Sequence, residues 1–153
     1  MPGKDQGREE MKKFKFRLQK VLDVKEQVIR KTQRDLAFHE NQKAQAEAEL
    51  TKLQETLMAQ SQKIDAMHDD SVADIQMEYD YFYQLLEATK AQQQKIRQIE
   101  QKIEEIRNLL MEQQKERKIL AKLKEKYQNS YLESVRKEEQ ILLDELAVIG
   151  SRS

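Results

Sequence analysis

Apolar residues recur along this chain at alternating steps of four and three, the heptad pattern of helices that pack as a coiled coil. The first run has both ends apolar, whereas its middle, from Thr32 to Ala46, is polar or small except for Leu36. We therefore expect a helix over about residues 14–67 whose middle packs weakly. The positions of this run are Leu18, Leu22, Lys25, Ile29, Thr32, Leu36, His39, Lys43, Ala46, Leu50, Leu53, Leu57, Gln60, Ile64 and Met67.

A polar stretch, HDDSVAD at residues 68–74, interrupts this pattern. Asp69, Asp70 and Ser71 suit a helix N-cap, because their side-chain oxygens accept hydrogen bonds from free N–H groups in the first turn. Ser71 and Asp74 have the spacing of a capping box, although Glu or Gln is the usual partner. The sequence thus predicts a turn at about residues 68–71 and a second helix over about residues 72–148.

The second heptad run begins at Ile75 and slips by one position after Ile96, which predicts a stammer, a local overwinding of the coiled coil. Two long helices joined by a short turn predict an all-α fold, an antiparallel two-helix coiled-coil hairpin. Residue 18 then lies opposite about residues 120–125. The positions of this run are Ile75, Tyr79, Phe82, Leu86, Thr89, Gln93, Ile96, Ile99, Ile103, Ile106, Leu110, Gln113, Arg117, Leu120, Leu123, Tyr127, Tyr131, Val135, Leu142, Leu146 and Ile149.

The composition agrees with helices that stay mostly in contact with water. Charged residues make up 37% of the chain, and the few Gly and Pro residues lie near its ends. The net charge of zero argues against a dedicated nucleic-acid binder. The absence of Cys fits a reducing compartment, and no apolar run resembles a membrane span or a signal peptide. We expect a soluble cytoplasmic protein with a flexible leader at residues 1–10 and one coiled-coil domain at residues 11–153.

Catalytic and metal-binding motifs are missing from the sequence. The interior has no Gly for a phosphate-binding loop, and there is no Cys nucleophile or zinc-binding spacing. His39 lies on the heptad run and His68 lies at the turn, so both fit structural roles. Helix capping explains the acidic residues around the turn, which also lack the central Gly of an EF-hand. We expect a protein that is not an enzyme and that binds no cofactor or metal.

Aromatic residues are concentrated in one window, MEYDYFYQLL at residues 77–86. At about 100° per residue, its apolar side chains cover an arc of roughly 200°, whereas one partner helix covers about 100°. The rings could simply thicken the hairpin beside its turn. Alternatively, they form a docking site, since Tyr and Phe are enriched where binding energy concentrates. The candidate docking residues are Tyr79, Phe82, Tyr83 and Leu86.

The N-terminal stretch FKFRLQKVL, residues 14–22, combines apolar and basic side chains. One helix face holds Phe14, Leu18, Val21 and Leu22, while Phe16 points roughly opposite Leu18. Such a segment could begin an amphipathic helix, lie on an anionic membrane surface or enter an acidic protein groove. The candidate binding residues here are Phe14, Phe16, Arg17, Lys20 and Val21.

The order of these features resembles the FliJ family of bacterial flagellar export proteins. The resemblance rests on the opening F-x-F-x-L-x-x-V-L from Phe14 to Leu22, a polar turn, Y-x-x-F-x-x-x-L from Tyr79 to Leu86, a long polar return helix and a C-terminal acidic D-E-L. It covers about residues 11–147. It implies an antiparallel coiled coil similar to the central stalk of rotary ATPases, in the type III export apparatus that serves flagellar motility and chemotaxis.

The resemblance also implies partners. The terminal end of the hairpin would sit in the hexameric ring of the export ATPase FliI, which assigns Phe14, Phe16, Arg17, Lys20 and Val21 to that contact. The export gate protein FlhA would bind Tyr79, Phe82, Tyr83 and Leu86. Export chaperones are expected as further partners, and the protein is expected to be a monomer in isolation, placed peripherally at the cytoplasmic side of the cell membrane.

Two alternatives remain open from the sequence. The weak turn permits a generic structural coiled coil, such as a parallel homodimer in which the chain does not fold back. A stalk subunit of a rotary ATPase or of a virulence-type secretion system would have a similar composition.

Overall fold

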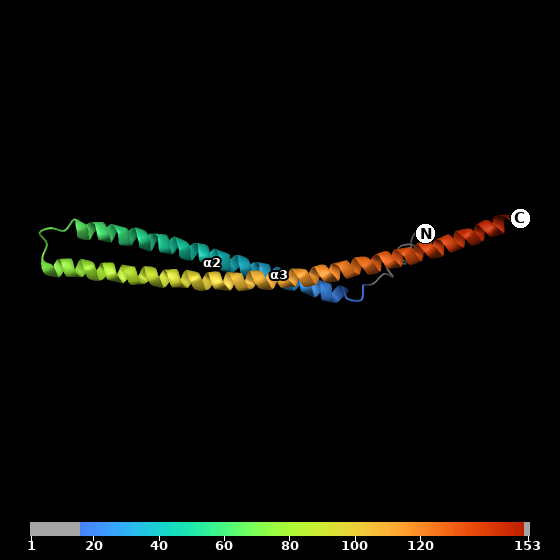
Figure 1. The fold of residues 1–153 in the computed structure, drawn as a ribbon, viewed down its shortest axis with the longest axis horizontal. Coiled ribbons are helices and arrows are strands. Elements are labelled where there is room, and N and C mark those ends of the chain that lie inside the picture. Colours follow the sequence, from blue (N-terminus) through green and yellow to red (C-terminus); the bar gives the residue numbers. More distant parts are fainter. Residues whose placement is uncertain (1–15, 152–153) are drawn as a thin grey trace, which may run out of the picture. The chain divides into compact units, whose positions relative to one another are not determined.

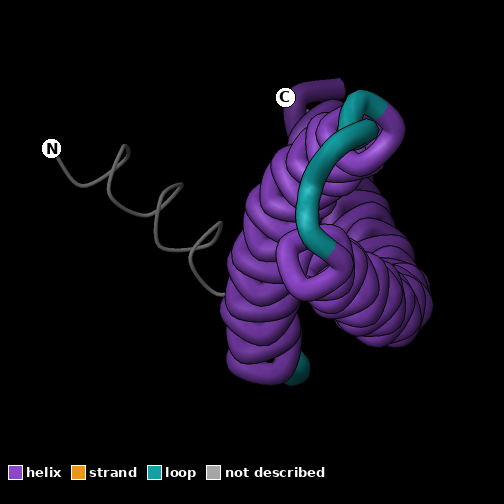
Figure 2. Tube along the Cα trace, turned by 90° about the vertical axis from the view of Figure 1, so that its left-hand side faces the viewer, coloured by secondary structure: helices purple, strands orange, loops and turns teal. Residues whose placement is uncertain are grey.

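The computed structural model describes residues 16–151, and this part of the chain forms two long α-helices. Helix α2 runs over Gln19–Asp65 and helix α3 over Val72–Ser151. A short loop joins them, and no strand occurs within residues 16–151 (Figures 1 and 2). The two helices pack against each other, which confirms the expected all-α helical hairpin. The expected leader at residues 1–10 lies outside the described residues.

Contacts gather in two compact units, to which both helices contribute. One unit is Lys31–Leu110, which contains the loop between the helices. In the part of the chain that the structure describes, the other combines residues 16–30 with residues 111–151. The assignment of residues 11–153 to a single coiled-coil domain stays a prediction.

Within Lys31–Leu110 the two helices run antiparallel. Gln60 of α2 donates a hydrogen bond to the main-chain oxygen of Glu78 at 3.0 Å. Farther from the loop, Gln92 of α3 donates to the main-chain oxygen of Ala46 at 3.0 Å. From the first pair to the second, the residue number falls on α2 and rises on α3, as an antiparallel hairpin requires. The α2 positions predicted to face its partner are all buried or half-buried in this unit.

The register of α3 differs from the sequence prediction between Ile75 and Ile96. The predicted positions Tyr79 and Gln93 are exposed, whereas Glu78 and Gln92 take their places on the less exposed face. Steps of three and four then alternate without a slip, so the predicted stammer is wrong. Apart from Leu86, the less exposed positions of α3 in this unit define its seam: Ile75, Glu78, Phe82, Leu85, Thr89, Gln92, Ile96, Ile99, Ile103, Ile106 and Leu110.

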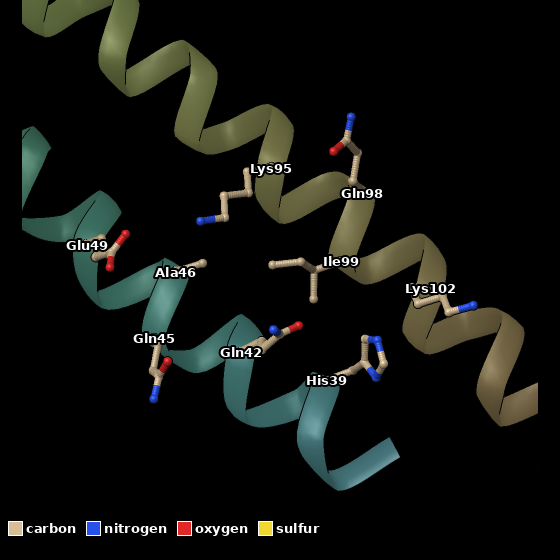
Figure 3. A pocket seen from close by; sticks show the side chains of 9 residues that line it. All are labelled: His39, Gln42, Gln45, Ala46, Glu49, Lys95, Gln98, Ile99 and Lys102. Atoms are coloured by element: carbon tan, nitrogen blue, oxygen red, sulfur yellow. The ribbon is translucent and has the colours of Figure 1, made fainter. Parts of the chain in front are cut away.

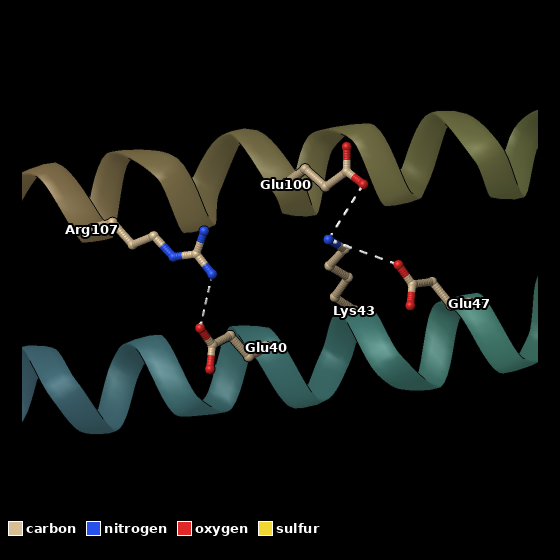
Figure 4. Close-up of polar contacts among 5 residues, drawn as sticks. All are labelled: Glu40, Lys43, Glu47, Glu100 and Arg107. Atoms are coloured by element: carbon tan, nitrogen blue, oxygen red, sulfur yellow. Dashed lines mark hydrogen bonds and ion pairs between the residues drawn. The ribbon is translucent and has the colours of Figure 1, made fainter.

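The middle of α2 contributes little apolar surface to the seam, as predicted. Thr32 and Ala46 are buried, and His39 and Lys43 are half-buried. Ion pairs flank this part: Arg107 lies 3.2 Å from Glu40, and Lys43 lies 3.5 Å from Glu100 and 3.8 Å from Glu47 (Figure 4). Exposed pairs of this kind stabilise by about 0–1 kcal/mol each, so they add little to the weak packing.

The turn begins earlier than predicted, because α2 ends at Asp65. The backbone tightens there, with the Met67 N–H donating to the Ile64 carbonyl at 3.1 Å. Ser71 caps the next helix: its hydroxyl oxygen accepts from the Asp74 N–H at 3.2 Å, and its carbonyl accepts from the Ile75 N–H at 3.0 Å. No non-Gly residue of the described chain has a positive φ, so the loop needs no Gly.

In the second unit the start of α2 packs on α3. Leu22 and Ile29 are buried, and Lys25 forms an ion pair with Glu116. The Phe16 ring centroid lies 6.2 Å from that of Tyr127. These contacts bracket the predicted position of residue 18 opposite about residues 120–125. Farther along α3, however, the predicted seam positions Arg117, Tyr127, Leu142, Leu146 and Ile149 are exposed.

Candidate docking surface

Two tyrosines next to the turn leave their rings exposed. Tyr79 is 42% exposed and Tyr83 is 58% exposed. One turn of helix separates them, so both lie on the same flank of α3, roughly 90–130° from the centre of the seam. Leu86, which is half-buried, lies between this flank and the seam. These three residues form a continuous strip, here called the tyrosine flank.

Phe82 has a different position from its neighbours. It is half-buried on the seam of α3, between the half-buried Glu78 and the buried Leu85. Its ring and the ring of Tyr83 form a T-shaped pair, with centroids 5.7 Å apart and planes at 77°. Phe82 therefore links the seam to the tyrosine flank, and its substitution would affect both.

Tyr81 lies on the opposite side of the seam from Tyr79. It is 45% exposed, and Met77, one turn earlier on the same side, is 70% exposed. The structure thus divides the aromatic window into two flanks separated by a seam. The predicted apolar arc of roughly 200° wraps around the seam instead of extending to one side of it.

A cluster of polar side chains supports this region. Gln60 is buried and donates from its amide nitrogen to the Glu78 carboxylate as well as to its main-chain oxygen. Lys63 lies 3.0 Å from the same carboxylate. The hydrogen bond from Gln60, followed by that from Lys63, lowers the pKa of Glu78 below its ordinary value. Glu78 is therefore an anion at neutral pH, held on the seam by two partners.

The N-terminal candidate residues separate in the structure. Phe16 is 8% exposed and precedes the helix, since its carbonyl accepts from the Gln19 N–H in a turn. The helical projection that turned Phe16 away from the partner helix was therefore wrong. Arg17, Lys20 and Val21 are exposed on or just before the first turn of α2. Phe14 lies outside the described residues.

A shallow polar groove lies along the middle of the Lys31–Leu110 unit (Figure 3). Ala46 faces Ile99 across the groove, and its small side chain leaves space between the helices. The His39 ring accepts or donates locally, with Nδ1 2.8 Å from the Asp35 carbonyl oxygen and 3.2 Å from its carboxylate. The groove holds amides and charged side chains but no pairing of a nucleophile with a base, so we assign it no catalysis.

The last part of α3 has an exposed apolar strip that the sequence reasoning partly missed. Three of its members were assigned to the seam, but α3 exposes them at residues 142, 146 and 149. The available signal was the difference in length between the two predicted helices. The second helix is longer, so the apolar pattern near its end continues where the first helix has no residues to pair with it. The strip consists of Ile141, Leu142, Leu143, Leu146, Val148 and Ile149, each more than half exposed.

Membrane spans and metal sites are both missing from residues 16–151. No helix there has a segment long and apolar enough to cross a membrane. Within the same residues, no group of three or more His, Asp or Glu side chains is placed to hold a metal ion.

Comparison with protein families relates most of this chain to a known one. Residues 14–153 match the family model described as Flagellar FliJ protein. Comparisons with curated proteins and with solved structures give no significant match.

Proposed function

The chain belongs to the FliJ family of flagellar proteins, and on this basis we propose that it is the stalk of the flagellar export ATPase ring. Membership makes the chain a component of flagellar protein export and not a member of a known enzyme family. The proposal adds its partners: the hexameric ATPase FliI, the export gate protein FlhA and export chaperones, which it would escort. The site of action would be the cytoplasmic side of the cell membrane, reached through the export apparatus.

The observation that carries the gate contact is the tyrosine flank. Tyr79 and Tyr83 keep their rings exposed beside a seam on which the charged Glu78 is half-buried. Exposed aromatic side chains on a rigid helix lose little side-chain entropy when a partner covers them. Tyr79, Tyr83 and Leu86 would therefore supply the gate-binding surface, with Phe82 setting its position from the seam.

The ATPase contact has looser support. Arg17, Lys20 and Val21 present a basic and apolar surface at the start of α2. Phe16 would act indirectly, because its ring packs against Tyr127. A ring around an asymmetric two-helix stalk offers each subunit a different contact. The stalk can thereby favour the nucleotide-bound conformation in some subunits over others, as a ligand shifts a conformational equilibrium.

Addition of the purified protein should raise ring formation and ATP hydrolysis by the flagellar export ATPase. The reason is that a stalk binds assembled rings in preference to free subunits, which shifts the assembly equilibrium. The measurement is steady-state ATP hydrolysis and sedimentation of the ATPase across a range of stoichiometries. Unchanged hydrolysis and assembly at every ratio would count against the stalk.

Charge reversal at the start of α2 tests which surface makes that contact. An Arg17→Glu, Lys20→Glu variant should stimulate the ATPase less than the native protein does. Arg34→Glu with Lys52→Glu is the matched control, since it makes the same exchanges at exposed positions elsewhere on α2. If the two variants stimulate the ATPase equally, the start of α2 does not make the ATPase contact.

Loss of the tyrosine flank should weaken binding to the export gate. We expect Tyr79→Ala with Tyr83→Ala to reduce affinity about tenfold or more, because central aromatic anchors each contribute about 1–2 kcal/mol or more. Titration calorimetry with the gate's cytoplasmic part measures this. Phe82→Ala with Leu86→Ala should weaken binding too, but with some loss of thermal stability.

Gln84→Ala with Gln94→Ala is the matched control for that experiment, since both glutamines are exposed on α3 away from the tyrosine flank. If the Tyr79→Ala, Tyr83→Ala variant binds the gate as tightly as this control does, the tyrosine flank is not part of the interface.

A further inference from the structure

The first segment of α3 has two possible seams, and the structure uses the less apolar one. Both seams share Ile75, Phe82, Thr89 and Ile96. The observed seam adds Glu78, Leu85 and Gln92, whereas the alternative would add Tyr79, Leu86 and Gln93. A rotation of the helix by roughly 50°, half of the ~100° between successive residues, converts one into the other. Apolar burial alone favours the alternative, which exchanges a carboxylate for a tyrosine ring.

Two hydrogen-bonded contacts hold the observed setting. The Gln60 amide donates to the main-chain oxygen of Glu78 at 3.0 Å and also to the Glu78 carboxylate. The Gln92 amide donates to the main-chain oxygen of Ala46 at 3.0 Å and to the Glu49 carboxylate at 3.3 Å. Each contact joins a side chain of one helix to the main chain of the other. Rotation of α3 would break both and would leave the amide of Gln60, a buried residue, to find a new acceptor.

We infer that Gln60 and Gln92 form a rotational lock, which keeps Tyr79 turned away from α2 and Leu86 at the edge of the seam. Release of the lock lets residues 75–93 of α3 turn toward the alternative seam and bury part of the tyrosine flank. A polar layer that selects one register at some cost in stability is a known use of buried amides in coiled coils. The lock concerns the fold itself; its effect on gate docking rests on the proposed function.

Thiol labelling tests the lock, because the native chain has no cysteine. A Gln93→Cys reporter is exposed in the observed setting and faces α2 in the alternative. A Gln84→Cys reporter points outward in both settings. Each reporter is placed in three backgrounds, the first of which is the native chain. The second is a Gln60→Leu, Gln92→Ala variant, which lacks both amide donors. The third is a Gln54→Leu, Gln94→Ala control, in which exposed glutamines are replaced instead.

Alkylation of the Gln93→Cys reporter with iodoacetamide should slow by about threefold or more in the lock-free background, because labelling of a covered thiol follows its open population. The Gln84→Cys reporter should react at the same rate in all backgrounds. Partial unfolding would accelerate labelling, so it cannot imitate this result. An unchanged or faster rate at position 93 overturns the lock and leaves heptad continuity as the sole determinant of the setting. Gate binding plays no part in the readout, so the test is independent of the docking proposal.

Discussion

Individual polar residues decide which face of α3 the hairpin buries. The sequence indicated correctly that α2 would bury its heptad positions, including polar ones such as Thr32 and Gln60. The same reasoning assigned Tyr79 to the seam because Tyr79 lies one four-residue step after Ile75, and so missed Glu78 and Gln92. Their inward placement depends on hydrogen bonds to the other helix, and such pairings cannot be read from the periodicity of one helix.

The pH dependence of stability should report the environment of Glu78. Its pKa is lowered in the folded state, so between its folded and ordinary values the unfolded chain binds more protons. The stabilisation is therefore present above the ordinary pKa value of 4.5 and is lost as the pH falls through the folded value. Glu78→Gln should flatten the acid decline of Tm over this window.

Thermal melts followed by circular dichroism across the acid range measure that change. Glu87→Gln is the control, since Glu87 forms an exposed ion pair with Lys90 of the same helix at 3.6 Å. Equal slopes for the Glu78→Gln and Glu87→Gln variants would contradict the lowered pKa.

At the scale of elements, the sequence located the helices well and their ends less well. The second helix begins at Val72, as predicted, because Ser71 offers both an N-cap hydroxyl and the first helical acceptor. The start of the first helix was placed too early. A helix continued back to Phe16 would turn its ring away from α3, whereas the non-helical turn before Gln19 lets the ring contact Tyr127.

Ser71→Ala should destabilise the hairpin by about 1 kcal/mol, because it removes the side-chain acceptor for the Asp74 N–H. Urea unfolding at neutral pH measures this change in the free energy of unfolding. Asp70→Ala is the comparison, since Asp70 was an equally good cap candidate by residue type. Its change should stay within about 0.5 kcal/mol, as for other exposed sites. A larger loss from Asp70→Ala than from Ser71→Ala would mean that the cap had been assigned to the wrong residue.

At the scale of the whole molecule, the hairpin argues against one of the alternatives that the sequence left open, the parallel homodimer. In Lys31–Leu110 the seam of α3 is occupied by α2 of the same chain, which leaves no free seam there for a parallel homodimer. The family match favours the flagellar apparatus over other secretion systems and rotary ATPases. Partners could not be inferred from periodicity, since many coiled coils share this pattern.

Sedimentation equilibrium should accordingly give the mass of one chain, 18.2 kDa, at micromolar concentration. The physical reason is that intrachain packing has already used the apolar seam that a second copy would need. Leu142→Lys with Leu146→Lys, on the exposed strip of α3, is a control for weak association through that strip. A stable dimer in both the native protein and this variant would contradict the monomeric hairpin.

The uninterrupted heptad of α3 within Lys31–Leu110 also constrains how the length of this chain can change over time. A one-residue insertion within the helix would turn every later side chain by about 100° and present the wrong face to α2. Seven inserted residues would restore the phase, while the loop between Asp65 and Val72 absorbs any number at little cost. Inherited insertions and deletions should therefore collect in that loop, or arise as multiples of seven matched in both helices, so that the register between the helices is kept.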